Sequence, residues 1–174
     1  GSNFCTLNPL DISNGTLSEG NTKFTAAASG DFMQVRSTFA ASTGKWYWEV
    51  TATTVSENEA WIAGILEINK ANISTNWYTG GWDNAVNGNC YGVQDQDKKV
   101  TGGSQSSFTS GITDGSVVGI HLDLDSGTTT IAISVDGSDK GTMYSSLTAA
   151  EYSPALNLYG DPAAVSVADV NFGQ

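Results

Sequence analysis

DGSVVGIHLDLDSGTTTIAISVDG, residues 114–137, carries the clearest structural signal in the chain. Apolar residues occupy alternate positions in each half, namely Val118, Ile120, Leu122 and Leu124, and then Ile131, Ile133 and Val135. This period of two is that of a β-strand with one face in a core. The DSGTT segment between the halves and Asp136-Gly137 after them are typical of hairpin turns. The stretch therefore predicts two antiparallel strands followed by a further hairpin turn.

A second stretch, KWYWEVTAT at residues 45–53, repeats the alternation. Trp46 and Trp48 share one face of this predicted strand with Val50 and Ala52, so we expect both indoles in the core, and we expect Trp61 to be buried too. Further strands are predicted at residues 24–28, 32–39, 60–68, 89–94, 98–101, 153–159 and 163–172. Short strands at such intervals, with turn residues between them, favour an all-β antiparallel sandwich or jelly roll. A single helical turn is predicted, at residues 147–151.

The length and charge of the chain narrow the functional classes. Its 174 residues suffice for one domain with a sizeable core, and we expect Gly1-Ser2 to be a cloning remnant and residues 3–174 to form that domain. Seven Lys and Arg against eighteen Asp and Glu give a net charge of −11. A chain this acidic repels phosphate, so nucleic acid is not expected as a partner. No apolar run approaches the roughly 20 residues that span a bilayer, so membrane insertion is not expected.

Cys5 and Cys90 leave two alternatives open. A disulfide between them would close a loop of about 85 residues and stabilise the fold, whereas two buried thiols are the favoured reading. A transition-metal centre is not predicted, because one His and no CxxC pair do not supply a ligand set. No cofactor is expected, with calcium as a minor alternative at the acidic pairs Asp95/Asp97 and Asp136/Asp139.

Six short motifs follow one another in an order that resembles the SPRY domain family. They are STGKWYWEV, WIAGI, YGVQ, the stretch at residues 114–137, YSPALNLYG and VSVADVNFG. The opening NFCTLNPLD and GTLSEGN resemble the SPRY variant met in bacteriophage and metagenomic virion proteins. The resemblance runs from about Phe4 to Gly173 and implies a concanavalin A-like sandwich. It departs from the family pattern at Gly115-Ser116, where Gly-Asp is usual, and at Val135-Asp136-Gly137, where Asn-Gly is usual.

Catalysis is not expected. Glycosidases on such sandwiches need two carboxylates that flank the scissile bond, and the ExDxE spacing that commonly supplies them is missing from this sequence. Asp123 and Asp125 share a strand face but run into a turn, so we interpret Asp125 as a turn former and Asp123 as a solvated or cross-strand partner. His121, the single histidine, is expected to be a hydrogen-bonded sheet residue, because no recognisable motif ties a nucleophile to it.

An aromatic-rich loop is the main functional signal. Residues 75–89 read TNWYTGGWDNAVNGN and place three large rings, Trp77, Tyr78 and Trp82, beside Asp83 and Asn84. Sugar rings stack on indoles while their hydroxyls bond to amides and carboxylates, and Trp and Tyr are also enriched at protein-binding hot spots. The loop therefore indicates a ligand surface for glycan or protein, with the alternative that the rings plug one end of the sandwich.

The SPRY resemblance implies that ligands bind on loops at one end of the sandwich. By position it adds Asp95 and Gln96, residues 104–110, and Tyr159 and Asp161 to the candidate site. The sequence thus predicts a non-catalytic recognition module of a phage or virus-like particle, of tail-fibre or head-fibre type, that binds host-surface glycan. The expected setting is the virion surface or the extracellular space, with homo-oligomers formed through the parent fibre. The alternatives are a protein-interaction module and a structural decoration domain.

Overall fold

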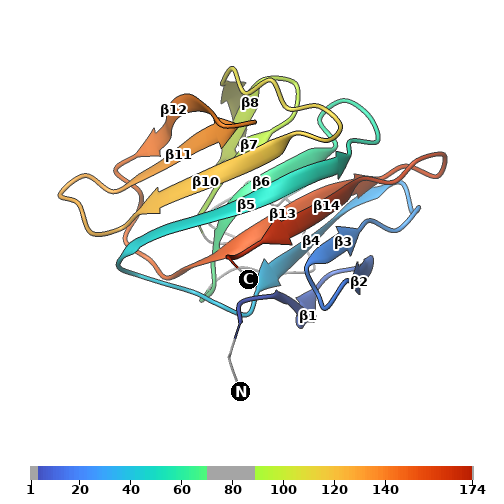
Figure 1. The fold of residues 1–174 in the computed structure, drawn as a ribbon, viewed down its shortest axis with the longest axis horizontal. Helices are drawn as coiled ribbons and strands as arrows, with labels where there is room; N and C mark the ends of the chain where they lie inside the picture. The colour runs from blue at the N-terminus through green and yellow to red at the C-terminus, as the bar shows by residue number, and fades with distance from the viewer. Residues whose placement is uncertain (1–3, 70–88, 174) are drawn as a thin grey trace.

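The structure, a computed structural model, describes residues 4–69 and 89–173 as two stacked antiparallel sheets (Figure 1). Sheet A contains, in spatial order, β1 (Leu7–Ile12), β4 (Asp31–Ser37), β13 (Tyr152–Gly160), β6 (Trp61–Glu67), β7 (Cys90–Gln94), β8 (Lys98–Thr101) and β9 (Ser104–Ser107). Sheet B contains β12 (Ser138–Ser145), β11 (Thr130–Val135), β10 (Val117–Asp123), β5 (Lys45–Thr54), β14 (Val167–Asn171), β3 (Lys23–Thr25) and β2 (Thr16–Ser18). The predicted all-β sandwich is confirmed.

Residues 114–137 form β10 and β11, as their alternation predicts. β10 lies between β5 and β11, with Ile120 opposite Trp48 on one side and opposite Ile133 on the other. The turn from β11 to β12 consists of Asp136 and Gly137, whose φ values of 51° and 77° are the two positive angles of a type I′ hairpin. The β10–β11 pair runs without a register shift from Val118 to Asp123, whereas the β11–β12 pair has two.

The core lies between the two sheets. Its largest fully buried side chains include Trp61 and Ile65 from sheet A and Ile120, Ile131 and Ile133 from sheet B. Burying one such side chain stabilises the fold by about 1.5–3 kcal/mol. The predicted burial of Trp61 and Trp48 is confirmed, with exposed fractions of 0% and 5%.

Two local predictions are wrong. Trp46 is 39% exposed, because it stands at the start of β5, where the sandwich ends and no further layer covers its ring. The helical turn at residues 147–151 is missing, and bends take its place. The Tyr91 hydroxyl accepts a hydrogen bond from the Thr148 backbone N–H, and the Tyr152 hydroxyl donates one to the Thr148 carbonyl. The Tyr152 hydroxyl thus takes the Thr148 carbonyl, which an α-helix would pair with the N–H of residue 152.

Within residues 4–69 and 89–173, the four strands that the sequence did not predict are the edges of the two sheets. They are β1 and β9 at the edges of sheet A, and β2 and β12 at the edges of sheet B. β9 covers the first part of residues 104–110, which were expected to form a loop. Polar and charged side chains at a sheet edge discourage pairing with another chain. β9, for example, reads SQSS and lacks the apolar alternation of the inner strands.

Strand direction defines the two ends of the sandwich. At one end, β6 begins while β7 and β13 finish, because Trp61 pairs with Leu158 and Ile62 pairs with Gln94. The chain that leaves β5 reaches the same end, where the Ser56 hydroxyl donates to the Tyr159 carbonyl at 3.3 Å. β5 and β13 begin at the opposite end, together with β7.

Cys5 and Cys90 are not joined by a disulfide. Cys5 is half-buried near the start of β1, whereas Cys90 is fully buried on β7. Burial raises the pKa of the Cys90 thiol to about 11 and also raises that of Cys5. Of the two alternatives for these residues, the structure shows thiols.

Candidate functional site

The predicted site residues fall into two groups. Trp77, Tyr78, Trp82, Asp83 and Asn84 lie outside the described residues. The described residue that precedes β7, Asn89, donates hydrogen bonds from its backbone and its amide to the Glu67 carboxylate at the end of β6. These flanking positions lie at the end of the sandwich opposite the β7–β8 turn.

Asp95 and Gln96 occupy the β7–β8 turn. Asp95 is 1% exposed, and its two carboxylate oxygens accept hydrogen bonds from the backbone N–H groups of Trp61, at 2.9 Å, and Glu59, at 2.7 Å. Burial raises the pKa of Asp95 to about 6 and outweighs these bonds, which lower it. Gln96 is exposed, with a φ of 62°. Asp95 therefore fastens the start of β6 to the turn, and Gln96 faces solvent beside it.

Tyr159 and Asp161 lie at the same end, where β13 finishes. The half-buried Tyr159 ring packs against Phe32, with ring centroids 5.0 Å apart. The Asp161 carboxylate accepts a hydrogen bond from the Ala163 N–H at 2.7 Å. The Tyr159 N–H donates to the Ala60 carbonyl, which precedes the Trp61 that Asp95 holds. The structure thus brings together four of the nine predicted residues: Asp95, Gln96, Tyr159 and Asp161.

Aspartates fasten the neighbouring loops in the same manner. Asp97 accepts hydrogen bonds from the N–H groups of Ser110 and Gly111, Asp114 accepts one from Val55, and Asp136 accepts one from Val117. A short carboxylate side chain satisfies loop N–H groups that no strand pairs. These loops come from both sheets and are therefore held by carboxylates at one end of the sandwich.

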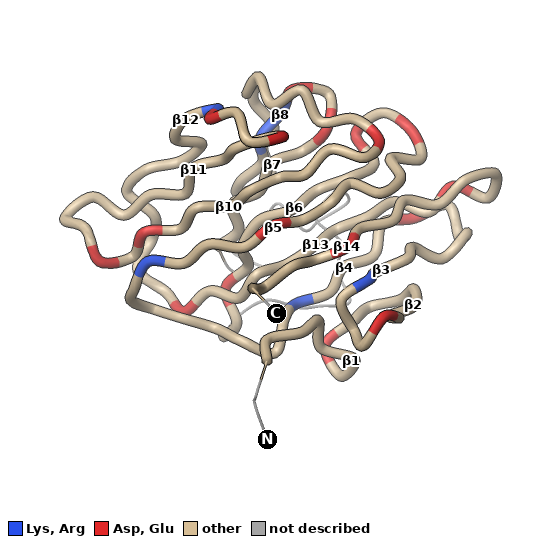
Figure 2. Tube along the Cα trace, in the orientation of Figure 1, with Lys and Arg blue, Asp and Glu red and all other residues tan. Residues whose placement is uncertain are grey.

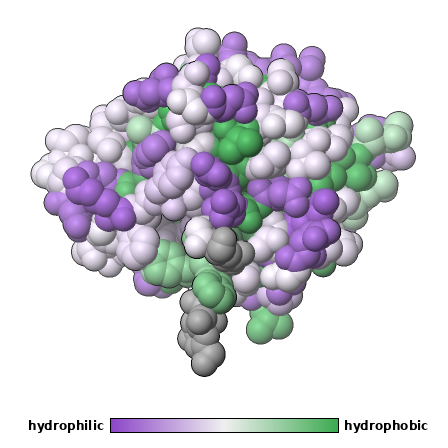
Figure 3. Space-filling model, in the orientation of Figure 1, coloured by the Kyte–Doolittle hydropathy of each residue, from purple (hydrophilic) through white to green (hydrophobic). Residues whose placement is uncertain are grey.

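We name this region the acidic end and define it by Asp31, Glu57, Glu59, Asp95, Asp97, Asp114, Asp136, Asp139 and Asp161. In Figure 2 acidic positions recur along the loops at the right and upper right. Among the described residues, Lys98 and Lys140 are the cations at this end, so nine carboxylates, of which Asp95 is buried, are gathered with two ammonium groups. Figure 3 shows the outward face of sheet B, which is mostly hydrophilic with small separate hydrophobic areas.

One ion pair neutralises part of this charge. Lys98 Nζ lies 2.6 Å from the Glu59 carboxylate, and that contact lowers the pKa of Glu59. The Gln94 amide donates to the Glu59 carbonyl at 2.9 Å, and Gln105 donates to Gln94 at 2.9 Å. This network ties β7, β8 and β9 to residue 59 and keeps the loop before β6 in place.

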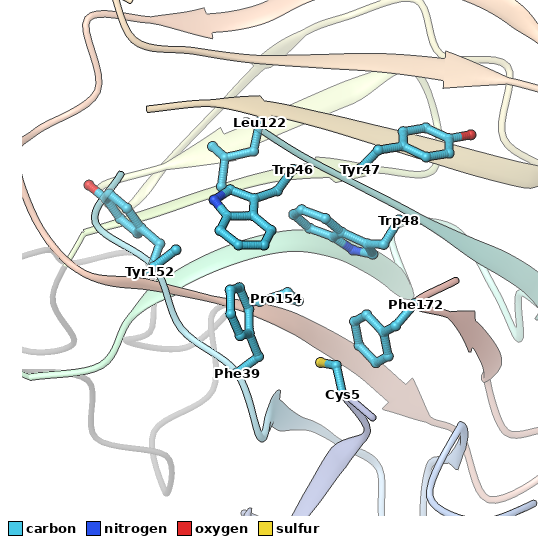
Figure 4. A pocket seen from close by; sticks show the side chains of 10 residues that line it. Cys5, Phe39, Trp46, Tyr47, Trp48, Leu122, Tyr152, Pro154 and Phe172 are labelled. Atoms are coloured by element: carbon cyan, nitrogen blue, oxygen red, sulfur yellow. The ribbon is translucent and has the colours of Figure 1, made fainter. Parts of the chain in front are cut away.

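A second feature, which the sequence did not predict, lies at the opposite end. A pocket of about 130 Å³ opens between the sheets there (Figure 4). Its lining is mostly apolar and consists of Cys5, Phe39, Ala41, Trp46, Tyr47, Trp48, Leu122, Tyr152, Pro154 and Phe172. We call it the aromatic pocket. In the sequence, the only indication of this pocket is the run of three aromatic residues, WYW at residues 46–48, near the first residue of a strand.

The Trp46 indole is held in one position despite its exposure. Its Nε1–H donates to the Thr43 carbonyl at 2.8 Å, and its ring packs against Phe39 with centroids 4.6 Å apart. Gly44 has a φ of 98°, and a Cβ at that residue would lie 2.8–3.1 Å from indole atoms. The Gly44 N–H donates to the Asp125 carboxylate at 2.6 Å. Glycine is therefore required at residue 44 both for its backbone angle and for the close approach of the indole.

The outward face of sheet B carries polar pairs. His121 Nε2 lies 3.1 Å from Ser134 Oγ in a hydrogen bond, which confirms the prediction of a hydrogen-bonded sheet histidine. Asp123 pairs with Lys45 across the strands at 3.0 Å and accepts hydrogen bonds from the backbone of Asp125 and Ser126. The predicted roles of Asp123 as a cross-strand partner and of Asp125 in the turn are confirmed.

Within residues 4–69 and 89–173, no group of three His, Cys, Asp or Glu side chains is placed to hold a metal ion. Over the same residues there is no helix of the length and apolarity that crossing a membrane requires.

Comparisons with known proteins agree on the fold. The SPRY domain family model matches residues 45–174. The SPRY domain of human HERC1 covers 97% of this chain and 98% of its own, with a TM-score of 0.75 and 14% identity. The PSpry domain of TRIM65 covers 98% and 92%, with a TM-score of 0.67 and 17% identity.

Stonustoxin covers 95% of this chain but only 26% of its own, with a TM-score of 0.65 and 21% identity. No curated protein sequence matches the chain significantly. At such identities the solved structures show the fold alone, whereas the family model covers most of the sequence. The strand order, the shared sandwich and the match over residues 45–174 lead to one conclusion: this chain belongs to the SPRY domain family.

Proposed function

We propose that this SPRY domain is a non-catalytic recognition module that binds a basic segment of a partner protein across its acidic end. SPRY domains are generally protein-interaction modules. The observation that carries the proposal is the gathering of nine carboxylates, eight of them not buried, against two ammonium groups at one end of both sheets. A polypeptide rich in Lys and Arg complements such a surface.

The rigidity of these loops supports recognition. Glu59, Gln96 and Asp97 adopt positive φ values of 63°, 62° and 55°, which are uncommon for residues other than glycine. Hydrogen bonds to Asp95 and Asp97 hold the neighbouring backbone. A surface fixed before binding loses less conformational entropy when a partner docks. The acidic end is therefore preorganised for binding.

Charge supports the same reading. The net charge of −11 steers cationic partners toward the domain and repels anionic ones. Charges at the rim of an interface raise the association rate more than they raise the affinity. Association with a basic segment is therefore expected to slow as salt is added, because ions screen exposed charges beyond about 8 Å at physiological ionic strength.

The aspartates and the histidine that could take part in catalysis already have structural partners. Asp95 and Asp97 accept backbone hydrogen bonds, and Asp123 pairs with Lys45. The His121–Ser134 pair lies on β10 and β11, whose backbone N–H groups belong to the strand ladder. An acyl-transfer site needs N–H donors aimed at the developing oxyanion. The strands around this pair offer none in the described part of the chain.

The finer prediction, a host-surface glycan bound on a phage or virus-like particle, stays a prediction. Its aromatic residues Trp77, Tyr78 and Trp82 lie outside the described residues. A glycan array with the same protein tests it. Binding to a polysaccharide, together with no enrichment of basic peptides, would favour the glycan reading over ours.

The test is selection from a random peptide library on the immobilised domain, followed by affinity measurement for the selected peptides. Glu57 is exposed at the acidic end, and Glu19 is exposed between β2 and β3, away from it. Glu57→Lys and Glu19→Lys change the net charge equally, which makes them a matched pair. We expect Lys- and Arg-rich peptides, weakened roughly 3- to 10-fold by Glu57→Lys at low salt and less than twofold by Glu19→Lys. Equal effects of both variants would refute the site.

A further inference from the structure

The aromatic pocket has walls from separate parts of the chain. Figure 4 shows the rings of Phe39, Trp46, Trp48 and Phe172 around one hollow, with Pro154 between them. Phe39 comes from the segment before β5, the two indoles come from β5, and Phe172 follows β14. Pro154 belongs to β13 in the other sheet. The fold thus converges aromatic rings on one point from both sheets.

The volume of the pocket limits what can enter it. An apolar cavity of about 150 Å³ holds one benzene molecule, so a pocket of about 130 Å³ holds a compact group of about five heavy atoms. An indole or a phenol ring is too large. A branched head group of methyl groups on one central atom fits.

Electrostatics separates a cationic head group from a neutral one. No lining residue carries a positive charge, and the nearby Lys45 is paired with Asp123 at 3.0 Å. The Asp125 carboxylate accepts a hydrogen bond from the Gly44 N–H, and Gly44 lies directly against the Trp46 indole. Aromatic ring faces attract cations, and indole attracts them most. The surroundings of the pocket therefore favour positive charge.

Hydration selects among cations. An unmethylated ammonium group is strongly hydrated and donates three hydrogen bonds. Among the residues that line the pocket, none carries a side-chain carboxylate or amide oxygen that could accept these bonds, and the side-chain oxygens are the hydroxyls of Tyr47 and Tyr152. A quaternary ammonium group has no N–H to satisfy, so it enters an apolar pocket at a lower desolvation cost.

We propose that the aromatic pocket binds a quaternary ammonium group, the trimethylated lysine side chain of a partner protein. The pocket is separate from the acidic end and lies at the opposite end of the sandwich. The choice of a polypeptide source rests on the proposed function, in which the partner is a Lys- and Arg-rich protein. The fixed Trp46 indole and Phe39 form its rim.

The experiment is an NMR titration of the ¹⁵N-labelled full chain, with the Trp46 indole N–H as the reporter. The probes are a Gly-Ser-Lys-Ser-Gly peptide with trimethyllysine, the same peptide with plain lysine, a carbon isostere in which the quaternary nitrogen is replaced by carbon, and choline. We expect the trimethyllysine peptide to bind about 5- to 30-fold more tightly than the carbon isostere. We also expect it to bind more tightly than choline and plain lysine.

Variants locate the effect. Trp46→Leu and Phe39→Leu keep the site apolar but remove a ring, and each is expected to weaken trimethyllysine binding at least fivefold. If one of them fails to fold, the other tests the same point. Phe108→Leu removes a half-buried ring after β9 and is the matched control, with no expected change. Glu57→Lys is expected to leave trimethyllysine binding intact, which separates this site from the acidic end.

Three results would overturn the inference. The first is a carbon isostere that binds as tightly as the cation, because this would show a merely hydrophobic pocket. The second is choline binding without peptide binding, which would assign a small metabolite instead of a protein. The third is a Trp46 signal that stays unmoved by all four probes. None of these results depends on whether basic library peptides bind the acidic end.

Discussion

Gly160 is the residue whose substitution tests the construction of the acidic end most sharply. It is the last residue of β13, and its carbonyl accepts hydrogen bonds from the N–H groups of Ser29, at 3.1 Å, and Gly30, at 2.8 Å. A Cβ at residue 160 would overlap the Ala27 carbonyl oxygen and lie 2.7 Å from its carbon. The backbone between β3 and β4 therefore crosses directly over Gly160, with no space for a side chain.

Gly160→Ala is expected to destabilise the domain by about 2–6 kcal/mol. Forcing the two backbone segments apart costs about 1–3 kcal/mol, as overpacking does. Weakening the bonds from Ser29 and Gly30 adds about 0.5–1.5 kcal/mol for each. For a chain of this length, each kcal/mol lowers Tm by about 2–4 °C, so the expected fall is about 4–24 °C.

Urea unfolding followed by tryptophan fluorescence measures this change. The matched control is Gly127→Ala, because a Cβ at Gly127 meets nothing within 4 Å. Alanine at an unstrained glycine leaves stability unchanged or raises it by up to about 1 kcal/mol. A Gly160→Ala protein within about 0.5 kcal/mol of the parent would refute the close approach that the structure shows.

Three further predictions concern the carboxylates, the buried arginine and the thiols. Folding raises the pKa of Asp95 from near 3.8 to about 6, so the folded state binds the proton more tightly than the unfolded state does. The contribution of this carboxyl group to the unfolding free energy therefore falls by about 3 kcal/mol as pH rises from about 4 to above 6. The unfolding free energy of the parent minus that of Asp95→Asn should therefore fall by about 3 kcal/mol over that range, and a difference that stays constant or rises with pH would contradict the assignment. Arg36→Met should lower the unfolding free energy by about 3–5 kcal/mol. Arg36 is 8% exposed, and its guanidinium donates to the Asp11 carboxylate at 2.6 and 3.0 Å and to the carbonyls of Glu67 and Ile68. Lys45→Met, which removes the exposed pair with Asp123, should by contrast change the midpoint of urea unfolding little. In a thiol assay Cys90 should react only in denaturant and Cys5 slowly in the native protein, and fewer than two thiols in denaturant without reductant would contradict the structure.

Inner strands could be predicted from the sequence because their side chains obey one rule. In β10 and β11 every second residue enters the core, so the alternation is visible without knowing the partners. The edge strands obey a different constraint, since they pair on one side only and must remain unattractive to other chains. β12 reads SDKGTMYS and buries only Met143 fully, so its strand character comes from the hairpin turn before it.

The candidate site was predictable only in part. Asp95, Gln96, Tyr159 and Asp161 do lie at one end of the sandwich, as their places in the motif order imply. The burial of Asp95 was not predictable, because its N–H partners at residues 59 and 61 are more than 30 positions away in the sequence. The exposure of Trp46 was missed for a related reason. Alternation tells which face a residue shares, but it does not tell where the opposite sheet stops.

The central claim is that the acidic end binds a basic polypeptide, and amide chemical-shift mapping tests it most directly. A Lys- and Arg-rich peptide from the library is titrated into the ¹⁵N-labelled domain at low and high salt. We predict that the shifts gather at the backbone amides of Glu59, Asp97 and Asp161 and shrink as salt rises. Shifts that gather elsewhere, or that are unchanged by salt, would contradict the account.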